Sequence, residues 1–364
     1  MKKPQLKKLK LKLPKSVPRA IRQSMNVEKK MTEALKGVPR ITNETVSEHR
    51  EAVLSGARKF IYPLQQSKHS IVRTSLLILT VVLLAFFSYC GLELYKYQTT
   101  SSFMYGVTRV IPFPAAKASK SWVSYESYLF ELRRNMHYYQ TQQAANFASK
   151  DGKVQLKTLK VQAMKQVILN AQVKQLASIN KVTVSDQAVT DQVNLVRNQN
   201  RLGSSQKVLN EVLSQFWGWG EADFRRELKQ QLLQQAVVAK LDTATNTRAD
   251  TALKQILSGS DFATVAAQVS EDSATKISGG NYPSVITPND TNLSPILTDQ
   301  IFKLQIGQTS GVINTGYTLE IVKVIDGGAT SVHAAHIQFT FLPISIFTNP
   351  LLSKNPPYKY ITIN

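Results

Sequence analysis

The residue types that most often do chemistry in proteins are scarce in this chain. Its 364 residues include a single cysteine, Cys90, and five histidines. No metal-binding spacing such as HExxH occurs, and neither a nucleotide-binding glycine loop nor a GxSxG motif is present. Disulfide, thiolate, zinc, nucleotide and serine-hydrolase chemistry therefore lack support. We expect the chain to use no metal and no other cofactor.

One polar loop, VSEDSATKISGGNYPSV from Val269 to Val285, holds a carboxylate that could act chemically. Asp272 stands among serines and a threonine, and the pair Gly279 and Gly280 follows it. The residues alone leave two interpretations open. Asp272 is either a reactive carboxylate or a helix cap, and Gly-Gly-Asn also suits an ordinary turn.

Short helices and strands must position this loop. Residues 248–271 predict two helices separated at Gly259, and residues 293–307 predict a third. The apolar residues of 316–326 and 336–341 alternate as they do in strands. A helical block precedes these mixed elements, so the order predicts the α+β fold class.

That helical block covers residues 122–245. Its apolar residues recur about every 3.6 positions, the pattern of helices that bury one face against each other. The positions are Leu156, Leu159, Met164, Val167, Ile168, Ala171 and Leu176, then Val189, Val193 and Val196, then Val208, Leu209, Val212, Leu213 and Phe216, then Phe224, Leu228, Leu232, Ala236 and Leu241.

A second apolar feature lies nearer the start of the chain. From Thr74 to Leu92 no residue is charged, and about 20 residues at 1.5 Å per residue cross a ~30 Å hydrocarbon core. The run predicts one transmembrane helix, with a buried core helix as the alternative. Lys68 and Arg73 precede it, so the positive-inside rule places the preceding tail in the cytoplasm and the rest outside.

The net charge of +21 is concentrated before this helix. Residues 1–73 hold 18 Lys/Arg and 5 Asp/Glu, with prolines at positions 4, 14 and 18. Such a composition predicts a disordered tail that contacts anionic lipid headgroups. We expect no nucleic-acid partner, because a lysine tract carries no groove-reading motif.

Two tracts of the helical block resemble a known family. In FWGWGEADFRRELKQQLLQQAVVAKL, Trp217 and Trp219 alternate with glycines in a turn before a helix, and SKSWVSYESYLFELR (119–133) leads into the first helix. Both are similar to the amino-terminal chaperone domain of SurA-type foldases. The resemblance implies a helical domain that binds unfolded or nascent secreted polypeptides.

The downstream part resembles the parvulin family of peptidyl-prolyl isomerases. DFATVAAQVSEDSATKISGGNY (261–282) and IFKLQIGQTSGVINTGYTLEIVKV (301–324) place the family's parts in the same order. The resemblance implies catalysis of X-Pro isomerisation without a cofactor. Such a catalyst must lower a barrier of ~18–20 kcal/mol that arises from amide resonance. It does so by favouring the twisted amide with a polar network beside an apolar proline pocket.

The catalytic residues that the resemblance implies are Asp272 in the loop and His336 in VHAAHIQF (332–339). Gly279 and Gly280 match the family's paired glycine. Two departures weaken the match: Thr318 stands where the last strand usually has a histidine, and Asn281 where aspartate is usual. His336 lies after the last strand, so either the domain is permuted and this strand pairs back into the sheet, or the chain begins a second, incomplete repeat.

The resemblance also implies a substrate pocket. The residues that match it are Phe302, Leu304, Ser310, Ile313 and Tyr317. The apolar members are equally compatible with plain core positions, and Ser310 with a surface turn.

Together these features predict a plasma-membrane protein with a single span, a cytoplasmic amino terminus and an extracytoplasmic bulk. The expected parts are a basic tail (1–73), a transmembrane helix (74–92), a linker (93–121), a chaperone domain (122–245), a parvulin-like domain (246–340) and a tail (341–364). Three functions remain open: a chaperone with isomerase activity, a non-catalytic holdase, and a membrane scaffold that docks a single partner.

Overall fold

The computed structural model describes residues 28, 30–33, 42–61, 64–118, 121–198 and 205–363. The chain divides into two compact units, 1–87 and 88–364. Much of the basic tail lies outside the described residues. Inside it, helix α2 (Asn43–Ile61) is regular, which departs from the predicted disorder. Glu44 in its first turn favours the helix because it faces the positive end of the helix dipole.

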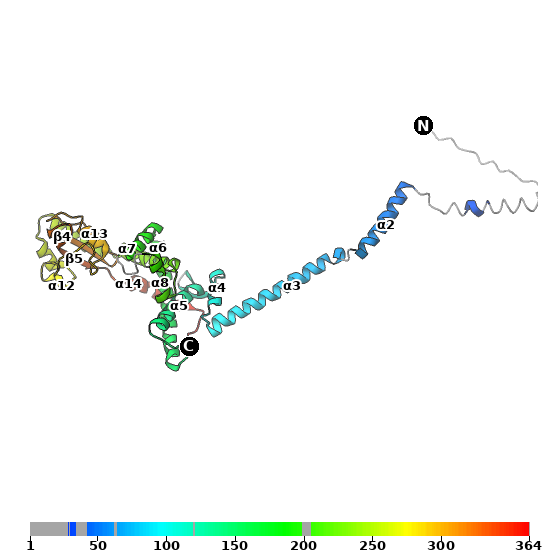
Figure 1. Cartoon of the computed structure of the whole chain (residues 1–364), viewed down its shortest axis with the longest axis horizontal. Coiled ribbons are helices and arrows are strands. Elements are labelled where there is room, and N and C mark those ends of the chain that lie inside the picture. The colour runs from blue at the N-terminus through cyan, green and yellow to red at the C-terminus, as the bar shows by residue number, and fades with distance from the viewer. Residues whose placement is uncertain are drawn as a thin grey trace, which may run out of the picture. The chain divides into compact units, whose positions relative to one another are not determined.

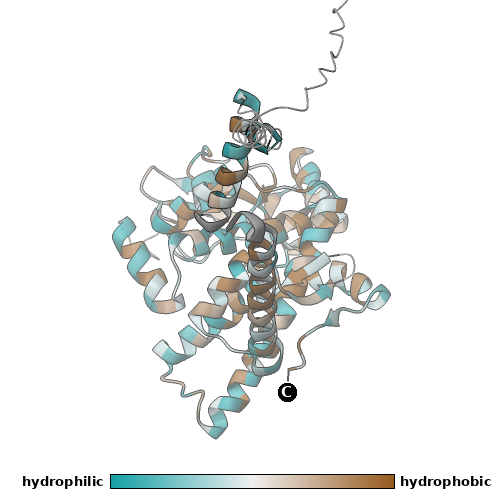
Figure 2. Cartoon of the chain, turned by 90° about the vertical axis from the view of Figure 1, so that its right-hand side faces the viewer, coloured by the Kyte–Doolittle hydropathy of each residue, from teal (hydrophilic) through white to brown (hydrophobic). Residues whose placement is uncertain are grey.

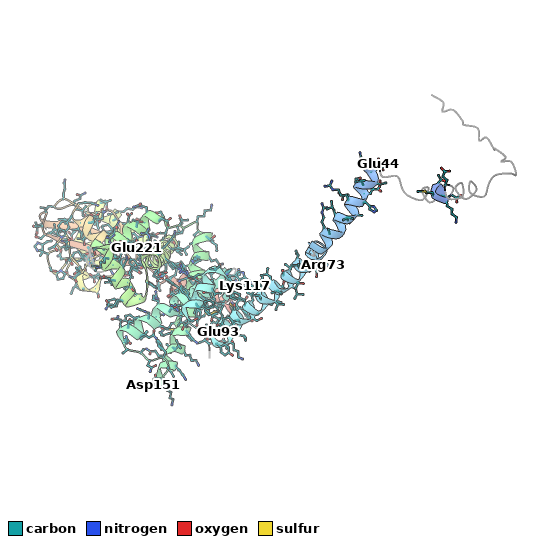
Figure 3. All side chains as sticks on the ribbon, turned by 45° about the vertical axis from the view of Figure 1, so that its right-hand side comes forward. Glu44, Arg73, Glu93, Lys117, Asp151 and Glu221 are labelled. Carbon is teal, nitrogen blue, oxygen red and sulfur yellow. The ribbon has the colours of Figure 1, made fainter. Side chains whose placement is uncertain are left out.

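The predicted membrane-spanning stretch is helical throughout. Helix α3 (Leu64–Gly91) continues into a π-helical turn, η1 (Leu92–Tyr97), and Figure 1 shows α3 as one long ribbon. Hydrophobic residues dominate its length (Figure 2). The charged side chains of Arg73 and Glu93 mark the two ends of the uncharged run (Figure 3).

From Ser70 to Tyr89, every side chain of this helix except that of Phe86 is exposed. Leu76, Leu77 and Ile78 each keep more than half of their surface accessible. Residues Ser70–Tyr97 form the one helix among the described residues that is long and apolar enough to cross a membrane. Apolar surface costs about 25 cal/mol per Å² in water, so such a helix suits a lipid environment.

The segments expected as linker and tail form regular structure together. After helix α4 (Ser102–Val110), strands β1 (Pro114–Ala118) and β2 (Ser121–Ser124) pair antiparallel. Strand β6 (Tyr358–Lys359) then joins the other edge of β1, which gives the order β2-β1-β6. The Trp122 ring stacks on Tyr360 at a centroid distance of 5.8 Å.

The helical block is built as its apolar pattern predicts. Serine side chains accept backbone hydrogen bonds at the starts of four helices: Ser124 at α5, Ser149 at α6, Ser185 at α7 and Ser205 at α8. Trp219 stacks on Phe130 with ring centroids 5.3 Å apart. The helices are α5 (Tyr125–Gln142), α6 (Lys150–Ile179), α7 (Asp186–Asn198), α8 (Gln206–Trp217) and α9 (Glu221–Leu241).

One carboxyl group in this helical core makes stability depend on pH. Glu131 is 2 % exposed, and Arg134 Nη2 lies 2.8 Å from its Oε2 as an ion pair outside hydrogen-bond geometry. Burial raises the pKa of Glu131 to about 7, Arg134 and Arg226 oppose the shift, and Glu227 adds to it. A carboxyl group whose pKa is higher in the folded state contributes its full stabilisation of the fold at pH values below its pKa in the unfolded chain. For Glu131 this stabilisation is lost as the pH rises through about 7.

We therefore expect Glu131→Gln to stabilise the protein at pH 8 by up to about 3 kcal/mol, and to have little effect at pH 4.5. Thermal unfolding midpoints of the full chain in detergent, compared at the two pH values, measure the difference. Glu211→Gln, on the exposed side of α8, is the matched control. An equal shift at both pH values would contradict the argument.

The remaining elements form a small mixed domain. Helices α10 (Thr243–Leu257), α11 (Phe262–Val269), α12 (Ser273–Lys276) and α13 (Pro295–Ile301) surround strands β3 (Ile313–Asn314), β4 (Thr318–Gly327) and β5 (Val332–Thr340). Helix α13 is shorter than predicted. The chain turns after Ile301, and the Gly307 amide donates to the Val324 carbonyl of β4, which needs the positive φ of +80° at Gly307.

The carboxy-terminal strand β5 completes this sheet, as the permuted arrangement requires. It pairs antiparallel with β4 over its whole length, from Thr340 opposite Thr318 to Val332 opposite Gly327. Its other edge takes backbone hydrogen bonds from the loop, including the Tyr282 amide to the Ala334 carbonyl at 3.0 Å. In the described part of the chain the sheet thus has three regular strands, β3-β4-β5, and an irregular fourth position at residues 280–286.

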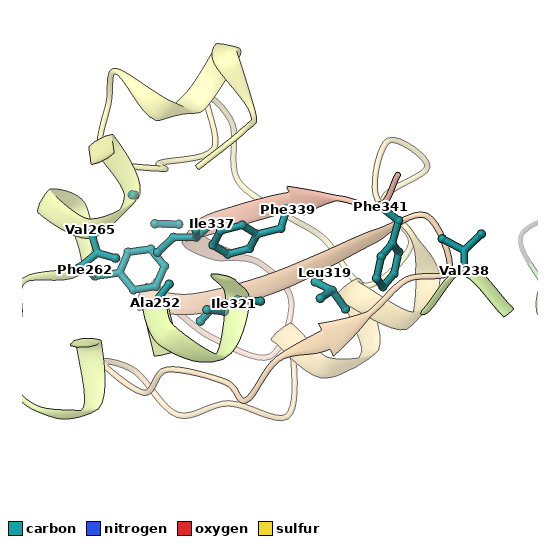
Figure 4. Packing of buried hydrophobic residues seen from close by; sticks show 12 residues of the cluster. Val238, Ala252, Phe262, Val265, Leu319, Ile321, Ile337, Phe339 and Phe341 are labelled. Carbon is teal, nitrogen blue, oxygen red and sulfur yellow. The ribbon is translucent and has the colours of Figure 1, made fainter. Parts of the chain in front are cut away.

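Both faces of the sheet are buried. On the helix-covered face, α10 and α11 pack on Leu319, Ile321, Ile337 and Phe339 (Figure 4). The opposite, loop-covered face is a second apolar cluster, made of Ile286, Leu297, Ile301, Ile313, Val322, Val324, Val332 and Ala334. After β5, helix α14 (Ile344–Lys354) packs on the first cluster and also on α6 and α9.

Candidate functional site

The structure brings His336 and Asp272 together. His336 points from β5 onto the loop-covered face and is 4 % exposed. Its Nε2 lies 2.9 Å from Asp272 Oδ2 and 2.9 Å from Thr275 Oγ1, and its Nδ1 lies 2.9 Å from Glu320 Oε2. The imidazole is therefore held at both ring nitrogens, on one side by α12 and its N-cap and on the other by β4.

Asp272 has the helix-cap role that the sequence left open, while its role as a reactive carboxylate stays a prediction. It is the N-cap of α12, where its carboxylate accepts from the Ala274 amide at 3.1 Å and from the Thr275 hydroxyl at 2.6 Å. Burial raises its pKa, but the hydrogen bonds from Thr275, Ala274 and His336 outweigh that effect, so the pKa lies below its usual value. The cap thus keeps this carboxylate ionised while it faces His336.

The two loop glycines allow the loop to lie directly against β5. Gly280 has φ +85°, its carbonyl accepts from the His336 amide at 2.8 Å, and a Cβ there would stand 2.3 Å from the His336 carbonyl oxygen. Gly279 has φ +68°, and a Cβ there would stand 2.5 Å from the Ala263 Cβ of α11. A side chain at Gly280 would push the loop away from β5, and one at Gly279 would push it away from α11.

Glu320 is the site residue that the sequence reasoning missed. It is 4 % exposed on β4, and its Oε1 accepts from the Thr318 hydroxyl at 2.8 Å. Thr318, which stands where the family has a histidine, thus reaches His336 only through Glu320. A signal was available: Glu320 shares its strand face with Val322 and Val324, and a carboxylate at an apolar, inward position needs a partner.

Tyr282 covers the histidine and was not predicted either. Its ring stacks on the His336 ring, with centroids 4.3 Å apart and planes at 20°. Its hydroxyl is buried and has no hydrogen-bond partner among the described residues. Burial and the nearby carboxylates of Glu320 and Asp272 raise its pKa above the usual range, so the phenol is neutral and needs an acceptor.

Three of the five predicted substrate residues lie together. Phe302, Leu304 and Ile313 belong to the loop-covered cluster, which Tyr282 also joins. The other two residues, Ser310 and Tyr317, do not belong to this cluster. Ser310 accepts from the Val322 amide at 2.9 Å and donates to the Gly311 carbonyl, while Tyr317 is 58 % exposed and its hydroxyl accepts from Gln231 of α9.

The arrangement suits hydrogen-bond catalysis and not metal binding. The two carboxylates lie on opposite nitrogens of one imidazole, so the three groups do not converge on a point. Among the described residues no group of three histidine, cysteine or acidic side chains is placed to hold a metal ion. What the network offers is a fixed imidazole and an ionised carboxylate beside an apolar cluster, arranged before any substrate arrives.

Comparisons with known proteins agree with this architecture. Residues 61–238 match the family model of the SurA-like N-terminal domain, and residues 232–326 match that of the PPIC-type PPIase (rotamase) domain. The second match ends before β5, so His336 lies outside it. No curated protein matches the chain.

Among solved structures, a foldase protein PrsA from Streptococcus pneumoniae str. Canada MDR_19A is 18% identical. The alignment covers 53% of this chain and 76% of that one, with a TM-score of 0.18. By the two family models, the chain combines a SurA-like N-terminal domain with a PPIC-type (parvulin) peptidyl-prolyl isomerase domain.

Proposed function

We propose that this protein is a membrane-anchored, extracytoplasmic folding factor that binds unfolded polypeptides and isomerises their X-Pro bonds. The observation that carries the isomerase part is the contact of 2.9 Å between His336 and Asp272, which strand β5 creates from the carboxy-terminal side of the domain. The two family matches support the coarser role in protein folding.

Anchoring rests on helix α3. Its exposed apolar side chains and the basic residues before it support a single span, with the amino terminus in the cytoplasm and the two folding domains outside the plasma membrane. The basic tail would then add attraction to anionic lipid headgroups.

The proposed chemistry needs only this chain's own groups. The proline ring of the substrate would lie against Phe302, Leu304 and Ile313, and the amide would twist beside the carboxylate of Asp272. As resonance is lost, the carbonyl oxygen and the nitrogen change their charge, and a network that is already in place stabilises the twisted form without reorganising. Glu320 and Thr275 position His336 in this scheme.

The burial of His336 favours a second candidate, the non-catalytic holdase. Tyr282 stacks on the imidazole, and only Asp272 of the network is partly accessible, with 24 % of its side chain exposed. Turnover requires that the substrate displace Tyr282 or reach the network through Asp272. A peptide clamp without turnover requires neither.

A protease-coupled prolyl-peptide assay on the full chain in detergent micelles separates these functions. We expect isomerisation faster than the uncatalysed exchange, which takes tens of seconds or longer. Suppressed aggregation of reduced lysozyme at the uncatalysed isomerisation rate would instead identify a holdase. If neither activity is present and one partner copurifies in a fixed ratio, the protein is a scaffold.

A further inference from the structure

Two pockets in the helical domain meet along one side of α6. The first, about 380 Å³, lies between α5, α6 and α9, and the second, about 410 Å³, lies between β2 and α6. Both are lined by Ser127, Val167 and Lys174, so they adjoin as the two halves of one groove. We call it the β2 groove. Each half is within the range of roughly 300–1,000 Å³ that is usual for ligand sites.

The groove runs along a backbone edge that is open for pairing. In the order β2-β1-β6, strand β2 has a strand neighbour on one side only in the described part of the chain. The second pocket contacts all four residues from Ser121 to Ser124. Successive side chains of a strand point to opposite faces, so a pocket that touches four in a row lies along the strand's edge.

An open edge is a template for an extended peptide. The same sheet already accepts one in this way, because β6 is a two-residue segment from the far end of the chain that lies on the opposite edge, at β1. A segment added to β2 would be about four residues or 13 Å long, at about 3.3 Å per residue. It would continue past Lys174 into the first pocket.

The charges of the groove indicate what that segment carries. The other charged residues of the lining have ion partners: Glu131 and Glu227 with Arg134, Arg226 with Glu126, and Lys229 with Asp186. Lys174 has no ion pair among the described residues. The Nε2 of Gln230, which also lines the first pocket, is buried without a hydrogen-bond partner there. The ammonium group of Lys174 is thus the cation of the lining without an ion pair in the described part of the chain, and a carboxylate is the partner that suits it.

We propose that the β2 groove binds an extended segment of a client polypeptide by strand addition to β2, with an aspartate or glutamate side chain of that segment on Lys174. This rests on the proposed chaperone function and names a client-binding site within it.

Peptide binding to the full chain in detergent micelles tests the proposal. The probe is the fluorescent octapeptide acetyl-Ser-Val-Thr-Val-Asp-Val-Thr-Ser-amide, measured by fluorescence anisotropy. A second peptide has asparagine for the aspartate, and a third has alternate amide nitrogens methylated so that they cannot donate. We expect the aspartate peptide to bind about tenfold more tightly than either.

Lys174→Gln is expected to remove the preference for aspartate, and Lys174→Arg to keep it. Lys165→Gln, which changes an exposed lysine of the same helix outside both pockets, should bind like the parent. Equal affinity for the three peptides, or a preference that survives Lys174→Gln, overturns the proposal.

Aggregation of reduced lysozyme, measured on the same samples, separates this proposal from the function on which it rests. If the parent suppresses aggregation but shows no preference among the peptides, the groove is the wrong site and the chaperone function stands. If the parent neither suppresses aggregation nor binds any peptide, both are wrong.

Discussion

Replacing His336 with alanine is expected to lower the rate constant for prolyl isomerisation by about 100-fold or more. The imidazole joins Asp272 to Glu320 across the sheet, with contacts of 2.9 Å on both nitrogens. Its loss removes the group that orients the Asp272 carboxylate, and it leaves the buried carboxylate of Glu320 and the partly exposed one of Asp272 facing a cavity. Removing one preorganised donor from an active site typically costs ~10²–10³ in rate.

The same strand offers a matched control. His333 lies three residues earlier on β5, half exposed, and pairs with Asp326 at the surface. His333→Ala should keep the parental rate, and a cooperative thermal unfolding transition shows whether His336→Ala is folded. If His336→Ala is folded and as fast as the parent, the assignment of the site is wrong. If it does not fold, Asp272→Asn, which keeps the shape of the side chain, tests the same network.

Phe339→Ala is expected to destabilise the isomerase domain by about 3–5 kcal/mol. Phe339 is 1 % exposed and lies at the centre of the helix-covered face, between Ile337 and Phe341 (Figure 4). Truncation leaves a cavity that α10, α11 and two strands cannot all close, and Phe→Ala substitutions in cores cost this much. Arg248 also loses the ring that its guanidinium faces at 5.7 Å.

Urea denaturation of the full chain in detergent, followed by limited proteolysis within residues 243–340, measures this effect. Leu342→Ala is the control, because Leu342 follows the same strand but is 43 % exposed. A loss below about 1 kcal/mol for Phe339→Ala would mean that β5 adds little to the core, and that the domain forms without its carboxy-terminal strand.

The helices were the predictable part of the fold. Apolar residues that recur about every 3.6 positions lie on one face of a helix, so the spacing indicates which face is buried. Serine caps such as Ser205 mark where the helices start. The sheet β2-β1-β6 was not predictable, because it pairs Lys117 with Tyr358 across more than 200 residues and its strands are too short to show alternation. The length of α13 was overestimated because the Gly307 turn is set by a hydrogen bond to β4, not by local sequence.

For the site, the sequence named the two residues that meet, and the structure supplied the reason that they meet. Asp272 and His336 are adjacent only because β5 pairs back onto β4. Glu320 was not predicted because Thr318, two residues earlier, is the position that matches the family's histidine. The roles of these residues, and of Phe302, Leu304 and Ile313 in substrate binding, stay predictions that the variants above test.

The position of β5 has a consequence for how the protein is made. It is an inner strand of its sheet, with β4 on one side and the loop at 280–286 on the other, yet it follows every other part of the domain in the chain. While the polypeptide is synthesised from its amino-terminal end, the position between β4 and the loop at 280–286 stays unfilled until Thr340 has been made. The domain that would assist the folding of other chains is thus itself completed late. A product that stops before residue 332 would lack the inner strand β5 of this sheet.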